Sequence, residues 1–220
     1  MPDPAATPAA TATGGKHLLY IADPMCSWCY GFAPVIGTIA ERLGEDIPVR
    51  VVMGGLRPGE TRASRDKDMH YLREAWANVG ALSGQPFDTR FFEREGFVYD
   101  TEPACRAVVT IRHVFPQEAL PFLQRLSTAF YGGNRDITDP GIIADIAAEA
   151  GFNRDEFLAA FNSDAARAET QQDFQRCLDA GIRGFPTVLV GAPGQGYQLV
   201  TQGFCALDDI EAPLMAWAQG

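Results

Sequence analysis

The sequence DPMCSWCYGFAP, residues 23–34, carries two cysteines, Cys26 and Cys29, in a C-x-x-C arrangement between two segments of different periodicity. The short apolar run at 17–22 in front of it is typical of a buried strand. Behind it, apolar residues recur at three- and four-residue spacing and share one helical face: Trp28, Phe32, Val35, Ile36, Ile39 and Leu43. The two cysteines are therefore expected where a strand gives way to a helix.

This position favours disulfide chemistry. Cys26 is expected at the first turn of the helix, where free backbone N–H groups and the positive end of the helix dipole stabilise a thiolate. The thiolate is the form of cysteine that attacks a disulfide. Cys29 follows one turn later and can close a small ring with Cys26. The pair is predicted to be a redox-active disulfide, with Cys26 attacking the substrate and Cys29 resolving the mixed disulfide.

The pair also has two other interpretations, half of a zinc site and two small buried residues on a helix. Zinc in a structural site takes four ligands, and the other candidates are scattered singly: Cys105, Cys177, Cys205, His17, His70 and His113. No metal site is therefore predicted, and a redox pair remains the favoured interpretation. Cys105 and Cys177 lie beside or on apolar helical faces, which indicates core positions, with a redox-sensor role as the alternative.

Composition limits the function classes. The 220 residues are 46% hydrophobic, which suits a globular protein of one or two domains with a sizeable core. The formal net charge of −10 argues against nucleic acid and against an anionic membrane surface as partners. No apolar run in the sequence approaches the roughly 20 residues of a membrane span.

Residues 1–15 are rich in Ala, Thr, Pro and Gly and are predicted to be disordered. They lack the basic and leucine-rich parts of a secretory signal, so a cytoplasmic protein is expected; the alternative is a mature chain whose leader has been removed. The odd number of five cysteines agrees with the absence of a structural disulfide framework. Cytoplasmic thiols are mostly kept reduced.

The remaining segments predict a mixed order of strands and helices. A second strand is expected at 47–53, helices and almost no strand from 63 to 180, a strand pair at 185–190 and 197–201, and a last helix. Within the helical part, Thr101 is expected to cap a helix that carries Pro103 in its first turn. The chain is therefore predicted to be an α/β protein.

Three segments carry a family resemblance: residues 23–32, 102–106 and 184–187. In this order they resemble the DsbA-like branch of the thioredoxin superfamily, and within it the cytosolic FrnE-like subgroup of predicted protein-disulfide isomerases. The resemblance implies a thioredoxin fold with an inserted all-helical domain. Residues 16–62 and 181–220 would form the thioredoxin-like domain, and 63–180 the inserted domain, whose last helix returns to the thioredoxin-like one.

The resemblance also implies a cis-proline loop facing the redox pair, here Phe185 and Pro186. Proline offers no N–H next to the sulfurs, and the backbone of Phe185 can pair with an extended peptide and hold its disulfide near Cys26. The alternative is a trans peptide bond, with Pro186 merely starting an edge strand. Trp28 is expected either to contact the substrate or to pack on the core.

Ser27 and Trp28 separate the two cysteines, where strongly oxidising members of the family carry Pro-His. Without the histidine no cation lies beside Cys26, and the negative charge of Asp23 opposes a thiolate. A less oxidising pair is therefore expected.

The predicted function is thiol–disulfide oxidation, reduction or isomerisation on protein or small-molecule disulfides. No bound cofactor is expected; the partner is a cellular thiol reductant, with glutathione as reductant or co-substrate. One alternative is a kappa-type glutathione-dependent transferase or isomerase, although these typically carry a serine in place of Cys26. The other is a non-enzymatic redox-sensing or chaperone module. The direction of reaction and the oligomeric state stay open.

Overall fold

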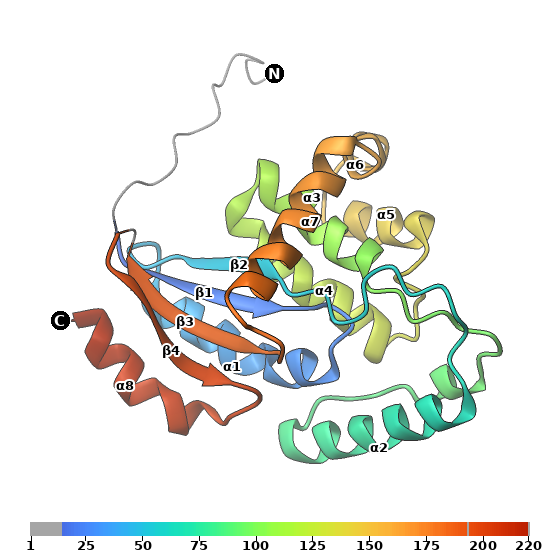
Figure 1. Cartoon of the computed structure of the whole chain (residues 1–220), viewed down its shortest axis with the longest axis horizontal. Coiled ribbons are helices and arrows are strands. Elements are labelled where there is room, and N and C mark those ends of the chain that lie inside the picture. The colour runs from blue at the N-terminus through green and yellow to red at the C-terminus, as the bar shows by residue number, and fades with distance from the viewer. Residues whose placement is uncertain (1–14, 193, 220) are drawn as a thin grey trace.

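A four-stranded sheet organises the structure, a computed structural model that describes residues 15–192 and 194–219 (Figure 1). The strand order is β2–β1–β3–β4. The strands are β1 (His17–Ala22), β2 (Val49–Met53), β3 (Thr187–Ala192) and β4 (Gly196–Gln202). β1 runs parallel to β2 and antiparallel to β3, and β3 and β4 form an antiparallel hairpin.

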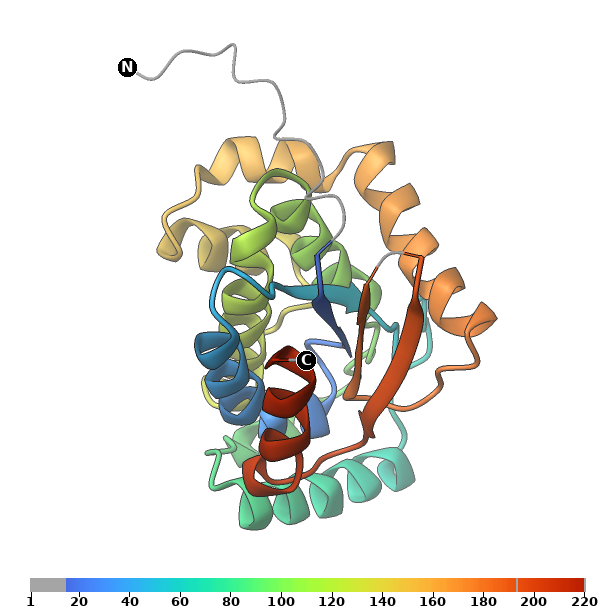
Figure 2. The same cartoon turned by 90° about the vertical axis from the view of Figure 1, so that its left-hand side faces the viewer.

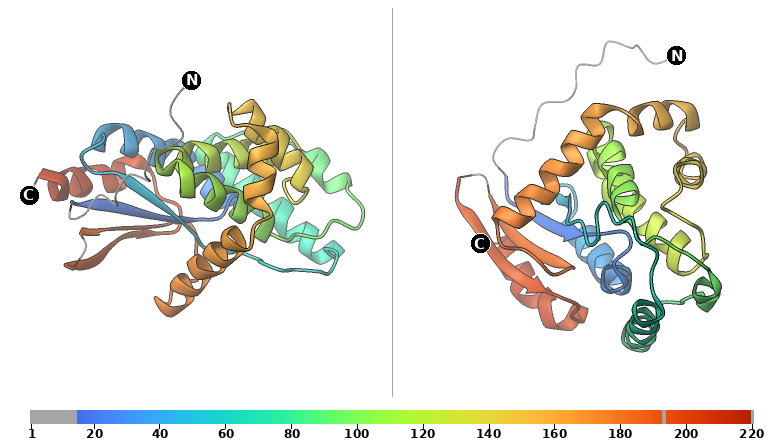
Figure 3. Two further views of the ribbon diagram at one scale, coloured as in Figure 1. Left: turned by 90° about the horizontal axis from the view of Figure 1, so that it is seen from above. Right: turned by 45° about the vertical axis from the view of Figure 1, so that its right-hand side comes forward.

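Helices cover both faces of this sheet. In chain order they are α1 (Ser27–Leu43), α2 (Asp66–Ser83), η1 (Thr89–Glu93), α3 (Glu102–Val114), η2 (Pro116–Glu118), α4 (Ala119–Tyr131), α5 (Pro140–Glu149), α6 (Arg154–Phe161), α7 (Asp164–Asp179) and α8 (Leu207–Gln219), where η marks a 3₁₀ helix. Figure 2 shows α1 and α8 on one face and α7 on the other. Helices α3 and α4 contact β2, and α5 and α6 lie outside them, farther from the sheet (Figure 3). None of the described helices is long and apolar enough to cross a membrane.

The predicted α/β class is confirmed. In the described chain the segment between β2 and β3 holds helices and no strand of the sheet. The strands predicted at 47–53 and 185–190 begin two residues later, at Val49 and Thr187. Of the predicted disordered tail, all but Gly15 lies outside the described residues. The division into a thioredoxin-like domain and an inserted domain stays a prediction.

Helix α2 packs against α1 and carries the centre of an aromatic cluster. The two helices approach closely at Gly31, where an added Cβ would lie 2.5 Å from Cγ1 of Val79. Trp76, one turn earlier on α2, is buried, with ring centroids 4.8–6.1 Å from those of five neighbours: Phe87, Phe91, Phe92, Phe130 and Tyr131. These apolar and edge-to-face contacts fix α2 and α4 beside the start of α1.

A buried ion pair attaches α7 to the sheet. The fully buried carboxylate of Asp173 accepts hydrogen bonds from the backbone N–H of Met53, at 3.0 Å, and from the guanidinium of Arg112. The same guanidinium donates to the carbonyl of Val51 and to Glu169, both at 2.8 Å. Arg176 of α7 also lies 3.5 Å from the Asp173 carboxylate, but the bonds that this carboxylate accepts from Arg112 and Met53 form only while α3, α7 and β2 stay together.

We expect Asp173→Ala to lower the free energy of unfolding by about 3 kcal/mol, because it removes one of the two carboxylates that pair with Arg112 and leaves the Met53 N–H without its acceptor. Urea denaturation followed by circular dichroism measures this loss. Asp179→Ala, at an exposed position of the same helix, is the control and should change the free energy by less than about 0.5 kcal/mol. Equal losses in the two variants would contradict the assignment.

Candidate redox site

Cys26 lies at the N-terminus of α1, as the periodicity predicts. It is the N-cap residue, with an extended backbone (φ −94°, ψ 114°), and its carbonyl accepts the N–H of Tyr30 at 3.0 Å. Its own N–H donates to the carbonyl of Asp23 at 3.0 Å, which closes the turn between β1 and α1. The thiol therefore stands where the first N–H groups of the helix lack intrahelical partners.

Cys29 lies below Cys26, inside the protein. The exposed fraction of Cys26 is 5% and that of Cys29 is 0%, and both thiols are free. Burial raises the pKa of the Cys29 thiol well above its usual value, and the neighbouring Cys26 adds to this shift. Cys29 is therefore protonated at neutral pH, and Cys26 is the member of the pair that reaches the surface.

Tyr20 of β1 lies beside Cys29. Its hydroxyl is buried and has no hydrogen-bond partner of good geometry in the described part of the chain. Burial raises the pKa of Tyr20, and Cys29 is the next largest cause of the shift. The hydroxyl therefore keeps its proton and is available as a donor to a Cys29 thiolate. From the sequence alone, Tyr20 is one residue of an apolar strand with no indicated role.

The peptide bond between Phe185 and Pro186 is cis, as predicted. The Cys26 thiol donates to the carbonyl of Phe185 at 3.6 Å, so this loop faces the redox pair. The Phe185 ring packs against Gly54, where an added Cβ would lie 2.1 Å from the ring. Pro186 is buried, and a role for the two residues in substrate binding stays a prediction.

Trp28 is half-buried and packs against the core. Its ring centroid lies 5.9 Å from that of Phe204, in the loop between β4 and α8. This contact agrees with the alternative that Trp28 packs on the core. A contact between Trp28 and the substrate stays a prediction.

The buried carboxylate of Asp23 fixes the turn that leads from β1 to Cys26. One oxygen of Asp23 accepts the N–H of Met25 at 2.8 Å, and the other accepts the N–H of Leu56 at 2.6 Å and the thiol of Cys105 at 3.4 Å. Burial raises the pKa of Asp23, while these bonds and one from Thr101 act to lower it. Asp23 therefore joins the loops after β1 and β2 to the start of α3.

Two hydroxyls from the segment between β2 and β3 donate hydrogen bonds to carbonyls of the turn before Cys26. Ser127 of α4 donates to the carbonyl of Pro24 at 2.9 Å, and Tyr99 donates to that of Met25 at 2.6 Å. Tyr131 lies 3.2 Å from the Tyr99 hydroxyl, oxygen to oxygen. None of the three could be predicted from the sequence, because no local pattern marks a residue whose hydrogen-bond partner is distant in the chain.

Thr101 is the N-cap residue of α3, with Pro103 in the first turn, as predicted. Its side chain makes no capping bond, because its hydroxyl accepts the N–H of Arg57 at 3.1 Å. The N–H of Thr101 in turn donates to the carbonyl of Arg57 at 3.2 Å. The N–H of Glu102 is satisfied instead by the carboxylate of Asp100, at 3.0 Å. Thr101 thus fixes Arg57 and contacts Asp23.

The other cysteines differ in burial. Cys105 and Cys177 are buried, which confirms their predicted core positions, and Cys177 donates to the carbonyl of Met53 at 3.7 Å. Cys205 is half-buried. None of the three is paired with another cysteine in the described chain.

Comparison with known proteins gives one family match. A model described as DSBA-like thioredoxin domain matches residues 19–210. A solved structure from Nitrosomonas europaea, provisionally named a protein disulfide isomerase, is 36% identical with a TM-score of 0.87, over 93% of this chain and 98% of that one. The cytosolic disulfide reductase DsbM of Pseudomonas aeruginosa is 25% identical with a TM-score of 0.77, over 92% and 98%. DsbM has also been solved with GSH (24% identity, TM-score 0.74, 93% and 100% covered).

The chain is also similar to a protein that is named as an adapter and not as an oxidoreductase. The ClpXP adapter protein SpxH of Bacillus subtilis is 23% identical over 167 residues, which make up 76% of this chain and 55% of that protein. The chain therefore spans about half the length of the curated relative it matches.

We expect iodoacetamide at neutral pH to modify Cys26 and leave Cys29 unmodified in the reduced protein. Cys26 reaches the surface, whereas Cys29 is fully buried and burial raises its pKa. Peptide mass spectrometry of samples taken over time measures each site, and half-buried Cys205 serves as an internal reference. Labelling of Cys29 at the rate of Cys26 would contradict the proposed difference; in denatured protein all cysteines should react.

We expect the stability of the wild-type protein to fall relative to Asp23→Asn as the pH rises above about 4. Burial raises the pKa of Asp23 from 3.8, so between the unfolded and folded pKa values the folded state binds more protons. Raising the pH through this interval therefore favours unfolding, and asparagine removes the effect. Urea denaturation of both proteins from about pH 4 to about pH 8 tests it. A constant difference across this range would show that Asp23 does not titrate above its usual pKa.

Proposed function

Because the chain belongs to the DSBA-like thioredoxin domain family, we propose that it is a thiol–disulfide oxidoreductase that uses Cys26 and Cys29 on protein or small-molecule disulfides. One observation carries the proposal. The Cys26 thiol stands at the start of α1 and faces the Phe185 carbonyl of the cis-proline loop, with the Cys29 thiol buried beneath it. A pair of this kind can exchange disulfides at its less buried sulfur, and the deeper sulfur can then resolve the mixed disulfide.

In the reducing direction, the Cys26 thiolate attacks one sulfur of the substrate disulfide and forms a mixed disulfide. The first substrate thiol leaves with the electron pair of the broken bond and takes up a proton. Cys29 then loses its proton and attacks the sulfur of Cys26, which releases the second substrate thiol. The substrate gains two electrons and two protons, and the pair becomes a Cys26–Cys29 disulfide.

Surrounding residues serve each step of this mechanism. The N–H groups of the first turn of α1 stabilise the attacking thiolate. Asp23 and the donors to the Pro24 and Met25 carbonyls keep the loop before Cys26 in one geometry. The Tyr20 hydroxyl can donate to Cys29 when that sulfur loses its proton. Phe185 and half-buried Trp28 provide the backbone and the ring that an extended substrate would contact.

We infer that reduction is the working direction and that a cellular thiol such as glutathione restores the pair. Two glutathione thiols would be oxidised to one disulfide for each Cys26–Cys29 disulfide reduced, which balances the electrons. The inference is supported by the similar DsbM, which is named a cytosolic disulfide reductase and has been solved with GSH. The Ser27-Trp28 spacer, which lacks a histidine, agrees with a pair that is not strongly oxidising.

Replacing the two cysteines tests the proposal. We expect Cys26→Ser to lower insulin-disulfide reduction to the uncatalysed background, because the attacking sulfur is lost. Cys29→Ser should form a mixed disulfide with the substrate that persists, which mass spectrometry of the intact protein detects. Cys205→Ser is the control and should keep the wild-type rate.

Two results would refute the proposal. One is a Cys26→Ser protein that still reduces insulin at the wild-type rate. The other is a wild-type protein that forms no Cys26–Cys29 disulfide in oxidised glutathione buffers. Glutathione conjugation by such a protein would favour the kappa-type alternative, and chaperone activity that survives loss of both cysteines would favour the non-enzymatic one.

A further inference from the structure

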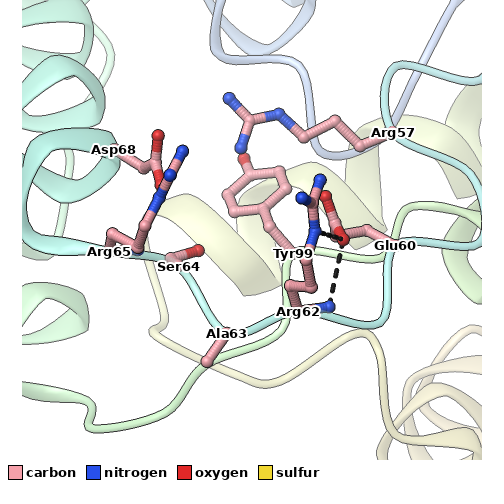
Figure 4. Close-up of a pocket in the computed structure, with 8 residues that line it drawn as sticks. All are labelled: Arg57, Glu60, Arg62, Ala63, Ser64, Arg65, Asp68 and Tyr99. Carbon is pink, nitrogen blue, oxygen red and sulfur yellow. Dashed lines mark hydrogen bonds and ion pairs between the residues drawn. The ribbon is translucent and has the colours of Figure 1, made fainter.

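A polar pocket of about 320 Å³ lies between Tyr99 and the segment that follows β2 (Figure 4). The segment after β2 supplies Arg57, Glu60, Arg62 and Arg65, the first helical turns of α2 supply Asp68, and Tyr99 forms part of the wall. A volume of roughly 300–1,000 Å³ is usual for sites that take small molecules. The mechanism above uses none of the three arginines.

Hydrogen bonds tie this pocket to Cys26. The hydroxyl of Tyr99 donates to the carbonyl of Met25, the residue before Cys26, at 2.6 Å. Leu56, the residue before Arg57, donates its N–H to the buried Asp23 at 2.6 Å. Cys26 and Arg57 are both close enough to Tyr99 to affect its pKa, which burial raises. A molecule in the pocket would therefore lie near the reacting sulfur.

Two of the arginines already have partners. Arg62 donates to Glu60 at 3.3 Å, and Arg65 donates to Asp68 at 3.1 Å. The backbone N–H and then the guanidinium of Arg62 lower the pKa of Glu60, and the guanidinium and then the backbone N–H of Arg65 lower that of Asp68. Each pair is therefore ionised, and its net charge is zero.

Arg57 differs from both. Its guanidinium carbon lies 5.3 Å from the centre of the Tyr99 ring, and no carboxylate in the described part of the chain forms an ion pair with it. Its backbone is held on both sides by Thr101, through N–H···O bonds of 3.1 and 3.2 Å. A fixed backbone and a ring under one face leave the edges of the guanidinium available to a ligand.

We propose that Arg57 binds a carboxylate of the thiol or disulfide that reacts at Cys26, a proposal that rests on the function proposed above. In a protein of net charge −10, a cation that pairs with no described carboxylate and lies on the ring of Tyr99, which contacts the residue before Cys26, favours an acidic partner. A guanidinium matches a carboxylate with two parallel hydrogen bonds. The ligand class is a small peptide thiol with free carboxylates, or an acidic side chain close to a cysteine in a protein.

A kinetic comparison tests the proposal, with glutathione disulfide as the acidic substrate and bis(2-hydroxyethyl) disulfide as the uncharged one. We expect Arg57→Gln to lower kcat/KM for glutathione disulfide by about tenfold, mainly through KM, because a charge-assisted hydrogen bond is lost. The uncharged disulfide should react as with wild type. Arg73→Gln is the matched control, because Arg73 also stacks on a ring, that of Phe92 at 4.3 Å, but lies outside this pocket.

Peptide substrates show whether the bound carboxylate belongs to a small thiol or to a protein side chain. Two synthetic peptide disulfides, with glutamate or glutamine beside the cysteine, are compared in the same variants. A loss confined to the glutamate peptide would support the pocket with a protein side chain as its ligand. A loss confined to glutathione disulfide would support a small peptide thiol.

Binding separates failure of this proposal from failure of the proposed function. Calorimetry with glutathione disulfide uses Cys26→Ser, which cannot react, with and without Arg57→Gln. About tenfold weaker binding in the double variant would support the pocket even if the protein had no reductase activity. Equal binding by the two proteins together with no loss on the glutamate peptide, or an equal kinetic loss on charged and uncharged disulfides, would overturn the proposal.

Discussion

The carboxylate of Asp23 is the constraint on which the site depends. It is fully buried, and a buried carboxyl is stable only when its oxygens are hydrogen-bonded. Its donors come from three separate places, the turn before Cys26, the loop after β2 and the start of α3. The position of the reactive thiol and that of Arg57 thus follow from one group, since Leu56 and Met25 each donate to it and each precedes one of these residues.

Burial divides the work of the two cysteines. They are one helical turn apart and chemically identical, yet only Cys26 reaches the surface and only Cys29 has the Tyr20 hydroxyl beside it. Their neighbours differ because α1 begins just past the end of β1, an interior strand, and Cys29 on its buried side lies beside Tyr20 of that strand. The difference in burial therefore gives the sulfur of Cys26 access to substrate and keeps that of Cys29 protonated until it is needed.

Features with local signals could be predicted from the sequence. The C-x-x-C pair at a strand-to-helix junction, the cis bond before Pro186, and the DsbA-like family with its thioredoxin fold are confirmed. Contacts between distant segments could not be predicted. Tyr99 and its acceptor Met25 are 74 positions apart, and Ser127 and Pro24 are 103 apart. Thr101 has a residue type that is common at helix caps, but its hydroxyl accepts the N–H of Arg57 instead of an N–H of α3.

The hydroxyls of Ser127 and Tyr99 have a consequence for modularity. Both lie within residues 63–180, yet they satisfy the buried carbonyls of Pro24 and Met25 at the redox turn. A minimal protein made by excising that helical segment would leave two buried acceptors unsatisfied, at a cost of about 1–3 kcal/mol each. The segment could also be exchanged between relatives, by recombination or by design. The turn before Cys26 would then be preserved only if the new segment places two hydrogen-bond donors at the same two carbonyls.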